Sequence, residues 1–359
     1  MEKRTHLLLR KGRGAASNAT GRFERHTQEI VDDGWGSIDE DLEPLATEVS
    51  LDASRTIIAR NSSPDIPFDR SINPYRGCEH GCVYCFARPT HAWLGLSPGQ
   101  DFESKLLMKP DAALLLRQEF ARPGYRPRVL AMGTNTDPYQ PIERLHGITR
   151  QILEVLSECR HPVGIVTKSA LIARDADILG PMAEKRLARA YISITTLDRD
   201  LARRMEPRAP TPAKRLKAIE ALSRAGVPVG VMFAPIIPGL NDHEMEEILQ
   251  AASHAGAVTA GYVLLRLPLE IKDLFAEWLQ AHYPDRAERV MTLVRDCRGG
   301  RAYDAEWGKR MKGTGPFADM VARRFAMACR RQGLDKRSWE MDTTLFRRPA
   351  ADADQFALL

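Results

Sequence analysis

Five short apolar runs, separated by helix-like segments, constrain the fold of this chain more than any other feature. The runs are rich in Val and Ile, as is typical of parallel strands that are buried on both faces. They are RVLAMGT (128–134), VGIVTK (163–168), RAYISITT (189–196), VPVGVMFAPII (227–237) and GYVLLRL (261–267). Strands that alternate with helices in this way predict βα units around a parallel sheet.

The segments between these runs have helical patterns. Residues 143–159 place apolar side chains at helical spacing, and residues 212–226 and 241–256 each end in a glycine. If residues 69–77 form a first strand, the count reaches about six βα units. We therefore predict an α/β fold built as a partial (β/α)6 TIM-type barrel, with an open doubly wound sheet as the alternative. In both folds the functional residues lie at the carboxyl ends of the strands.

Charge is unevenly distributed outside this central region. Residues 1–25 hold seven Lys/Arg and two Glu, residues 26–55 hold nine acids and one Arg, and residues 286–348 hold sixteen Lys/Arg and eight acids. No periodic apolar pattern supports structure near the N-terminus, so we predict a flexible, charge-segregated N-terminal extension over residues 1–55. We expect the barrel over 56–267, a helical, basic C-terminal extension over 268–345 and a tail over 346–359.

Neither a membrane span nor a signal peptide is apparent. No apolar run approaches the length of a membrane-spanning helix, and the N-terminus has only three consecutive leucines. We therefore predict a cytoplasmic protein without a membrane partner. The basic C-terminal extension is either a solvated surface or a face that binds nucleic acid.

Three of the six cysteines lie within the nine residues of GCEHGCVYC (77–85). Cys78, Cys82 and Cys85 have C-x3-C-x2-C spacing. Structural zinc takes four ligands, and the fourth would be His80, folded inward between two of the cysteines. A [4Fe–4S] cluster held by only three thiolates instead keeps one iron open for a small molecule. The other three cysteines are scattered and are expected to be buried core thiols.

This motif, with the aromatic Tyr84 before its last cysteine, resembles the signature of the radical S-adenosylmethionine superfamily. The resemblance implies that Cys78, Cys82 and Cys85 hold a [4Fe–4S] cluster that reductively cleaves S-adenosylmethionine to a 5′-deoxyadenosyl radical. It also implies that Tyr84 helps to bound the adenine site and that flavodoxin or ferredoxin supplies the electron. The alternative is a non-catalytic metal-binding protein that holds zinc or an iron–sulfur cluster for structure or electron transfer.

Later segments resemble the spore-photoproduct-lyase branch of this superfamily. GTNTDPYQPIE, TKS, SITTLDRDLARRMEPRAPTPAKRL and APIIPGLND follow the later strands in order, and the similarity covers about residues 71–265. In that branch, residues at these strand ends surround the cofactor. Carried over by motif, the resemblance implies four further cofactor-binding residues: Thr136, Lys168, Ser193 and Ala234.

Lys168 also has an interpretation that does not depend on the family. A lysine at the end of an apolar strand needs a partner, because an isolated buried ammonium group is costly. That partner is either Asp137 or Glu143 in an ion pair, or the carboxylate of the bound cofactor.

Two positions depart from the lyase branch. The lyase uses a cysteine after strand two as hydrogen donor and a tyrosine after the third cluster cysteine as a relay. The matching residues here are Thr134 and Phe86, whose O–H and C–H groups are poor hydrogen-atom donors. We therefore expect lyase-like radical chemistry on a different substrate, with nucleic acid, protein and small molecules all open.

Overall fold

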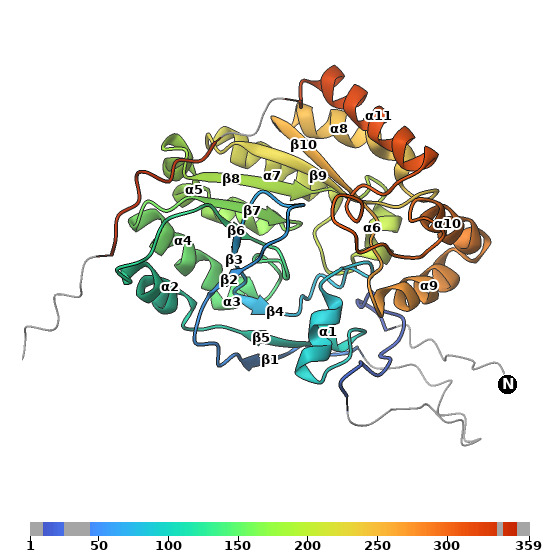
Figure 1. Ribbon diagram of the computed structural model, residues 1–359, viewed down its shortest axis with the longest axis horizontal. Coiled ribbons are helices and arrows are strands. Elements are labelled where there is room, and N and C mark those ends of the chain that lie inside the picture. The colour runs from blue at the N-terminus through green and yellow to red at the C-terminus, as the bar shows by residue number, and fades with distance from the viewer. Residues whose placement is uncertain (1–9, 25–43, 336–339, 350–359) are drawn as a thin grey trace, which may run out of the picture.

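A seven-stranded sheet forms the centre of the computed structural model, which describes residues 10–24, 44–335 and 340–349. Its order is β10 (Thr259–Leu264), β9 (Val229–Ile236), β8 (Ala188–Ser193), β7 (Val163–Thr167), β6 (Leu130–Met132), β3 (Arg70–Ile72) and β2 (Ile58–Arg60). The first six strands are parallel, and β2 pairs antiparallel with β3 at the edge. No pairing joins β10 to β2 within the described residues. The predicted partial (β/α)6 barrel is therefore confirmed (Figure 1).

Helices connect these strands and cover the sheet. They are α2 (Ala112–Ala121), α3 (Glu143–His146), α4 (Ile148–Glu158), α5 (Ala176–Glu184), α6 (Arg199–Met205), α7 (Pro212–Arg224) and α8 (Met245–His254), with 3-10 helices at Arg88–Leu94, Ala170–Asp175 and Asp242–Glu244. The helix predicted over 143–159 is divided into α3 and α4 at Gly147, whose φ is +62°. A glycine adopts this left-handed conformation without the usual Cβ strain.

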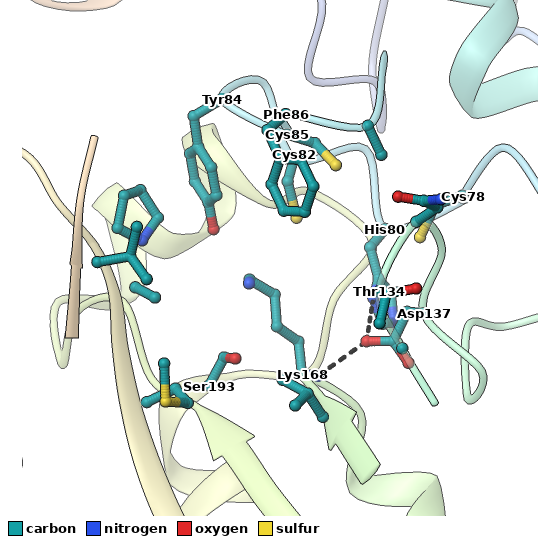
Figure 2. A pocket seen from close by; sticks show the side chains of 18 of the residues that line it. Cys78, His80, Cys82, Tyr84, Cys85, Phe86, Thr134, Asp137, Lys168 and Ser193 are labelled. Atoms are coloured by element: carbon teal, nitrogen blue, oxygen red, sulfur yellow. Dashed lines mark hydrogen bonds and ion pairs between the residues drawn. The ribbon is translucent and has the colours of Figure 1, made fainter. Parts of the chain in front are cut away.

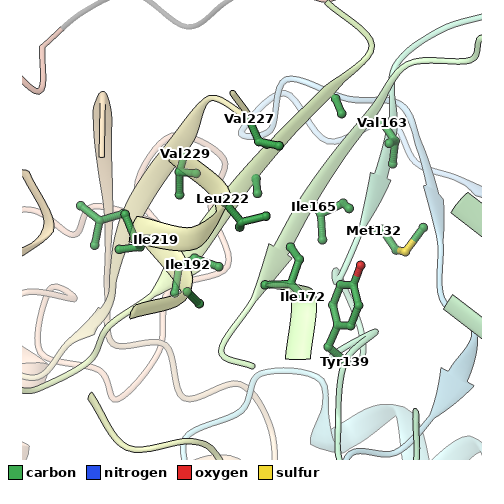
Figure 3. Close-up of a cluster of buried hydrophobic side chains, with 14 of the residues drawn as sticks. Met132, Tyr139, Val163, Ile165, Ile172, Ile192, Ile219, Leu222, Val227 and Val229 are labelled. Carbon is green, nitrogen blue, oxygen red and sulfur yellow. The ribbon is translucent and has the colours of Figure 1, made fainter. Parts of the chain in front are cut away.

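One face of the parallel strands packs against the surrounding helices. Ile165, Ile192 and Val229 on the strands lie in one buried cluster with Ile219 and Leu222 of α7 (Figure 3). Successive side chains of a strand point to opposite faces. At the intervening positions, Gly164, Arg189 and Tyr191 are partly buried and Val166 is exposed, whereas Ser193 is buried. The expectation that these strands are buried on both faces is therefore wrong for most of β7 and β8.

A second, three-stranded sheet lies beside the barrel and was not predicted. Its order is β1 (Glu48–Leu51), β5 (Lys105–Met108), β4 (Tyr75–Arg76), and the short helix α1 (Asp101–Ser104) precedes β5. Its parallel β1–β5 pair joins segments more than fifty residues apart. Local sequence patterns do not indicate such a pairing.

Residues 10–24 and β1 belong to the extension that we expected to be flexible, yet β1 is part of the three-stranded sheet and residues 10–24 are folded onto neighbouring segments. Ala15 and Ala16 are buried, and the amides of Gly14 and Ala15 each donate a 2.8 Å hydrogen bond to Glu103. The expectation fails here because a carboxylate from a distant segment satisfies this backbone. Residues 1–9 and 25–43 of the predicted extension lie outside the described residues.

Three further helices follow the barrel, as predicted: α9 (Ile271–His282), α10 (Pro284–Asp296) and α11 (Pro316–Gln332). The first two share a buried cluster with the cysteine-rich loop, in which Phe275 and Val290 join Val83. Helix α11 packs on α8, where Arg324 pairs with Glu246 at 2.7 Å. The extension thus helps to bury the motif loop, and the division at residue 267 stays a prediction.

Two other expectations are tested by burial and helix composition. The scattered Cys159, Cys297 and Cys329 are all buried, which confirms them as core thiols. Within the described part of the chain, no helix is both long and apolar enough to cross a membrane.

Candidate active site

A cavity of about 250 Å³ opens at the carboxyl ends of the parallel strands (Figure 2). The motif loop forms one side of it, and residues at the ends of β7, β8 and β9 form another. All eight residues that the sequence singled out line this cavity: Cys78, Cys82, Tyr84, Cys85, Thr136, Lys168, Ser193 and Ala234. Segments spread over more than 150 residues therefore meet at one place.

Strand alternation explains why the strand-end residues share the cavity. Val166 and Lys168 are two positions apart at the end of β7, as Met232 and Ala234 are on β9, and all four line the cavity. The β6 end approaches β7 closely at Gly133, which has a φ of +92°. A Cβ there would lie 1.9 Å from the carbonyl oxygen of Val166, so only glycine fits.

The motif loop is held by hydrogen bonds from the segment after β6. Thr136 donates to the carbonyl of Gly77 at 2.7 Å, and Gln140 donates to the same carbonyl at 3.3 Å. The Glu79 amide in turn donates to the Gln140 side chain at 2.8 Å. Because the hydroxyl proton of Thr136 is used in this way, the role of Thr136 toward a ligand is limited to its hydroxyl oxygen and its methyl group.

Arg88 supports the same loop and was not found from the sequence. Its fully buried guanidinium donates to the carbonyls of Cys82 at 2.9 Å and Gly99 at 2.8 Å, and it pairs with Glu103. A buried arginine that satisfies several carbonyls fixes the backbone around them. A lone arginine three residues after the motif carries no sequence signal for this role.

The three motif thiols are candidate ligands of a metal centre. Burial raises the pKa of Cys82 to about 12 and also raises the pKa of Cys78 and Cys85. Such thiolates form when cationic metal compensates their charge. In the described ranges, no three His, Cys, Asp or Glu side chains are grouped closely enough to hold one metal ion. The three thiols lie on one side of the cavity, as Figure 2 shows.

Lys168 extends into the cavity without forming an ion pair with any described residue. Its Nζ lies 5.6 Å from the centre of the Tyr84 ring, and no carboxylate of the described residues is within ion-pair distance. Asp137 instead accepts a 2.8 Å hydrogen bond from the Lys168 amide and lies 3.3 Å from His80 (Figure 2). Glu143 interacts with other side chains, and it accepts a 2.6 Å hydrogen bond from the Tyr75 hydroxyl. Neither ion pair considered for Lys168 is present.

A buried polar network lies behind Tyr84. The Tyr84 hydroxyl donates to Glu206, Thr195 donates to Glu206 at 2.6 Å, and Arg215 forms an ion pair with the same carboxylate. Burial alone would raise the pKa of Glu206, but the charges of Arg215 and Lys168 outweigh it and hold this pKa at about 2. The network thus orients the Tyr84 ring that lines the cavity.

The two positions that depart from the lyase branch also line the cavity. Thr134 donates to the side chain of Asn73 at 3.2 Å, and Phe86 is 46% exposed. Arg266 reaches the cavity beside Phe86 and was not found from the sequence. The sequence feature that could have identified Arg266 is the one that drew attention to Lys168, a cationic residue at the end of an apolar run.

Comparison with known proteins agrees with this geometry. The model of the radical SAM superfamily matches residues 72–252. The chain belongs to the radical SAM superfamily. The match covers the motif loop and β4 to β9, and it confirms the family resemblance. Membership implies a [4Fe–4S] cluster and S-adenosylmethionine as cofactors.

Relatives with similar sequences have no assigned activity in their names. An uncharacterised protein of Mycobacterium tuberculosis (strain H37Rv) is 36% identical over 232 residues, which are 64% of this chain and 68% of that protein. An uncharacterised protein of Methanocaldococcus jannaschii is 28% identical over 219 residues, or 61% of this chain and 78% of that protein.

Among solved structures, spore photoproduct lyase has a similar fold. Its complex with dinucleoside spore photoproduct has a TM-score of 0.54 and 14% sequence identity, covering 79% of this chain and 78% of the lyase. A lyase mutant with bound AdoMet and dinucleoside spore photoproduct has a TM-score of 0.51 and 15% sequence identity. The likeness covers 79% of this chain and 77% of the mutant lyase. At this identity the likeness establishes the fold alone.

Proposed function

We propose that this radical SAM enzyme holds a [4Fe–4S] cluster on Cys78, Cys82 and Cys85 and abstracts hydrogen from a substrate at the mouth of its cavity. The observation that carries this proposal is the meeting of the three motif thiols with the strand-end residues around one cavity. Three ligands leave one iron open, so the cavity beside the thiols is where a cofactor can bind that iron.

We assign the residues of the cavity to binding the parts of S-adenosylmethionine. When bound, the cluster supplies the electron that cleaves S-adenosylmethionine to a 5′-deoxyadenosyl radical, and flavodoxin or ferredoxin is the class of donor we expect. Tyr84 bounds the adenine, and Lys168 binds the methionine carboxylate with its unpaired ammonium group. Ser193 and Ala234 form the part of the cavity wall that contacts the cofactor. The Thr136 hydroxyl oxygen accepts a hydrogen bond from the cofactor.

The residues around the cavity argue for a substrate other than that of the lyase. Thr134 and Phe86 occupy the two positions at which the lyase relays hydrogen, and both line the cavity here. Besides the three motif cysteines, no cysteine is among the residues described as lining it. Hydrogen therefore does not return through a cysteine–tyrosine relay at these positions. Nucleic acid is one of the open substrate classes, and the basic C-terminal extension supports it.

The rival proposal is a non-catalytic zinc or iron–sulfur protein, and anaerobic purification distinguishes the two. We expect a brown protein with about four irons per chain that forms 5′-deoxyadenosine from S-adenosylmethionine when dithionite is added. Iron analysis and chromatography of the products measure both results. A colourless protein that contains zinc, or a brown protein that forms no 5′-deoxyadenosine, would overturn the proposal.

The role of Lys168 is tested by replacing it with Met, which keeps the length of the side chain but removes the charge. We expect the dissociation constant for S-adenosylmethionine to rise about tenfold, because a charge-assisted contact to the carboxylate is lost. Equilibrium binding to the oxidised protein measures this without turnover. Lys214→Met, at an exposed position on α7, is the matched control. Equal affinity of Lys168→Met and wild type would contradict the assignment.

A further inference from the structure

Arg266 is a second cation of the cavity that forms no ion pair within the described part of the chain. It follows β10, and its guanidinium contacts Met311 Sδ at 3.3 Å and the Tyr303 hydroxyl at 3.4 Å. Both are weak or neutral acceptors. Its Nε is buried without a hydrogen-bond partner among the described residues, and none of their carboxylates is within ion-pair distance. The guanidinium is therefore able to take up an anion.

The cofactor does not account for both unpaired cations. S-adenosylmethionine carries one carboxylate, and the proposed function assigns it to Lys168. The two cations also lie over different rings, because Lys168 contacts the Tyr84 ring whereas Arg266 lies 5.1 Å from the centre of the Phe86 ring. An anionic group of the substrate is then a candidate partner for Arg266.

Phe86 places an exposed aromatic ring beside Arg266. It lines the cavity next to Cys85, yet 46% of it is exposed although Arg266 lies over its ring. An exposed ring and a guanidinium therefore lie together at the edge of the cavity.

We propose that Arg266 and Phe86 form a rim subsite for a nucleotide unit of the substrate. Arg266 binds the phosphate, since a guanidinium matches the geometry of phosphate oxygens. Phe86 stacks on the adjoining base, as aromatic side chains do in sites for single-stranded nucleic acid. This assignment rests on the proposed function, because it identifies the molecule that faces the radical. The nucleotide unit is either a free nucleotide or part of a strand.

Binding of three pyrimidine probes tests the subsite. The probes are cytidine, cytidine monophosphate and a fluorescein-labelled strand of about twelve deoxycytidines; a pyrimidine avoids competition with the adenine of the cofactor. The cluster-loaded protein is used with saturating S-adenosylmethionine and no reductant. We expect Arg266→Met to weaken monophosphate and strand binding about tenfold, with cytidine unchanged. Phe86→Ala should weaken all three about fivefold or more.

Salt dependence and further variants complete the test. For the strand, the slope of log affinity against log salt should decrease by about one in Arg266→Met. Arg266→Lys keeps the charge but loses the planar fork, so an intermediate affinity is expected. It replaces Arg266→Met if iron content and circular dichroism show that the latter is misfolded. Arg128→Met, before β6 at the opposite end of the strands, should bind like wild type.

The outcomes distinguish a free nucleotide from a nucleic-acid strand, and failure of the subsite from failure of the proposed function. Much tighter binding of the strand than of the monophosphate identifies nucleic acid, and equal binding identifies a free nucleotide. Wild-type protein that binds none of the probes overturns the subsite, as does an Arg266→Met variant that weakens only S-adenosylmethionine binding. Failure of wild type to form 5′-deoxyadenosine instead overturns the proposed function, and the probe affinities are measured independently of it.

Discussion

Replacing Cys82 with Ala is expected to abolish both the brown colour of the anaerobically purified protein and its formation of 5′-deoxyadenosine. Cys82 is one of three thiols on the cavity, and with two thiolates the cluster has too few protein ligands to stay bound. The visible spectrum, the iron content and the 5′-deoxyadenosine yield should all fall to the background of their assays.

The matched control for this prediction is another buried cysteine. Cys159 is buried, as Cys82 is, but belongs to the hydrophobic core and not to the cavity. Cys159→Ala should keep the iron content and the 5′-deoxyadenosine yield of wild type, apart from a modest loss of stability. If Cys82→Ala retained both iron and activity, the cluster would be held elsewhere and the proposed site would be wrong.

Replacing Glu206 with Gln is expected to destabilise the protein strongly, by about 3–5 kcal/mol. The change removes the charge that faces Arg215 and leaves a buried guanidinium without its counter-ion. It also weakens the acceptor of the Tyr84 hydroxyl. Thermal unfolding measures the loss, and a rise in the dissociation constant for S-adenosylmethionine should accompany it, because the Tyr84 ring loses its support.

A surface ion pair provides the comparison. Glu158 pairs with Arg117, and both side chains are largely exposed, so Glu158→Gln should cost at most about 1 kcal/mol. Equal effects of the two substitutions would show that the Glu206 network is not a buried charge pair.

The pH dependence of this difference follows from the lowered pKa of Glu206. Its pKa is about 2 in the folded protein, against an ordinary value of 4.5. A depressed carboxyl pKa contributes stability that is fully present above the unfolded value and is lost as the pH falls toward the folded one. The stability gap between wild type and Glu206→Gln should therefore be constant near neutral pH and shrink below about pH 4.5. A gap that widened in acid would contradict the assigned charge state.

Patterns that repeat locally were sufficient for much of the fold and the site. The parallel strands β6 to β10 lie where apolar runs predicted them, because a run of neighbouring apolar residues indicates both a buried strand and its approximate length. The three cysteines and Lys168 were found in the same way. An aromatic residue between closely spaced thiols, and a cation that ends an apolar run, are unusual enough to be noticed without a structure.

Several of the contacts that were missed join segments far apart in the chain. Glu103 binds the backbone of residues 14 and 15, almost ninety positions away, and so a segment expected to be flexible is folded. Arg88 and Glu206 look like ordinary charged residues in the sequence. Only their burial against carbonyls or an opposite charge shows that they support the motif loop and Tyr84.

The sequence by itself determined the chemistry that this protein can host, because the number and spacing of cluster thiols are local properties of nine residues. Through the family resemblance it also predicted which strand ends would carry cofactor-binding residues. Only the tertiary structure decided that Lys168 forms no ion pair among the described residues and that Arg266 lies over Phe86. Such pairings depend on how strand ends converge in the open barrel, and a side chain's electrostatic partner is set by that convergence rather than by its neighbours in the chain.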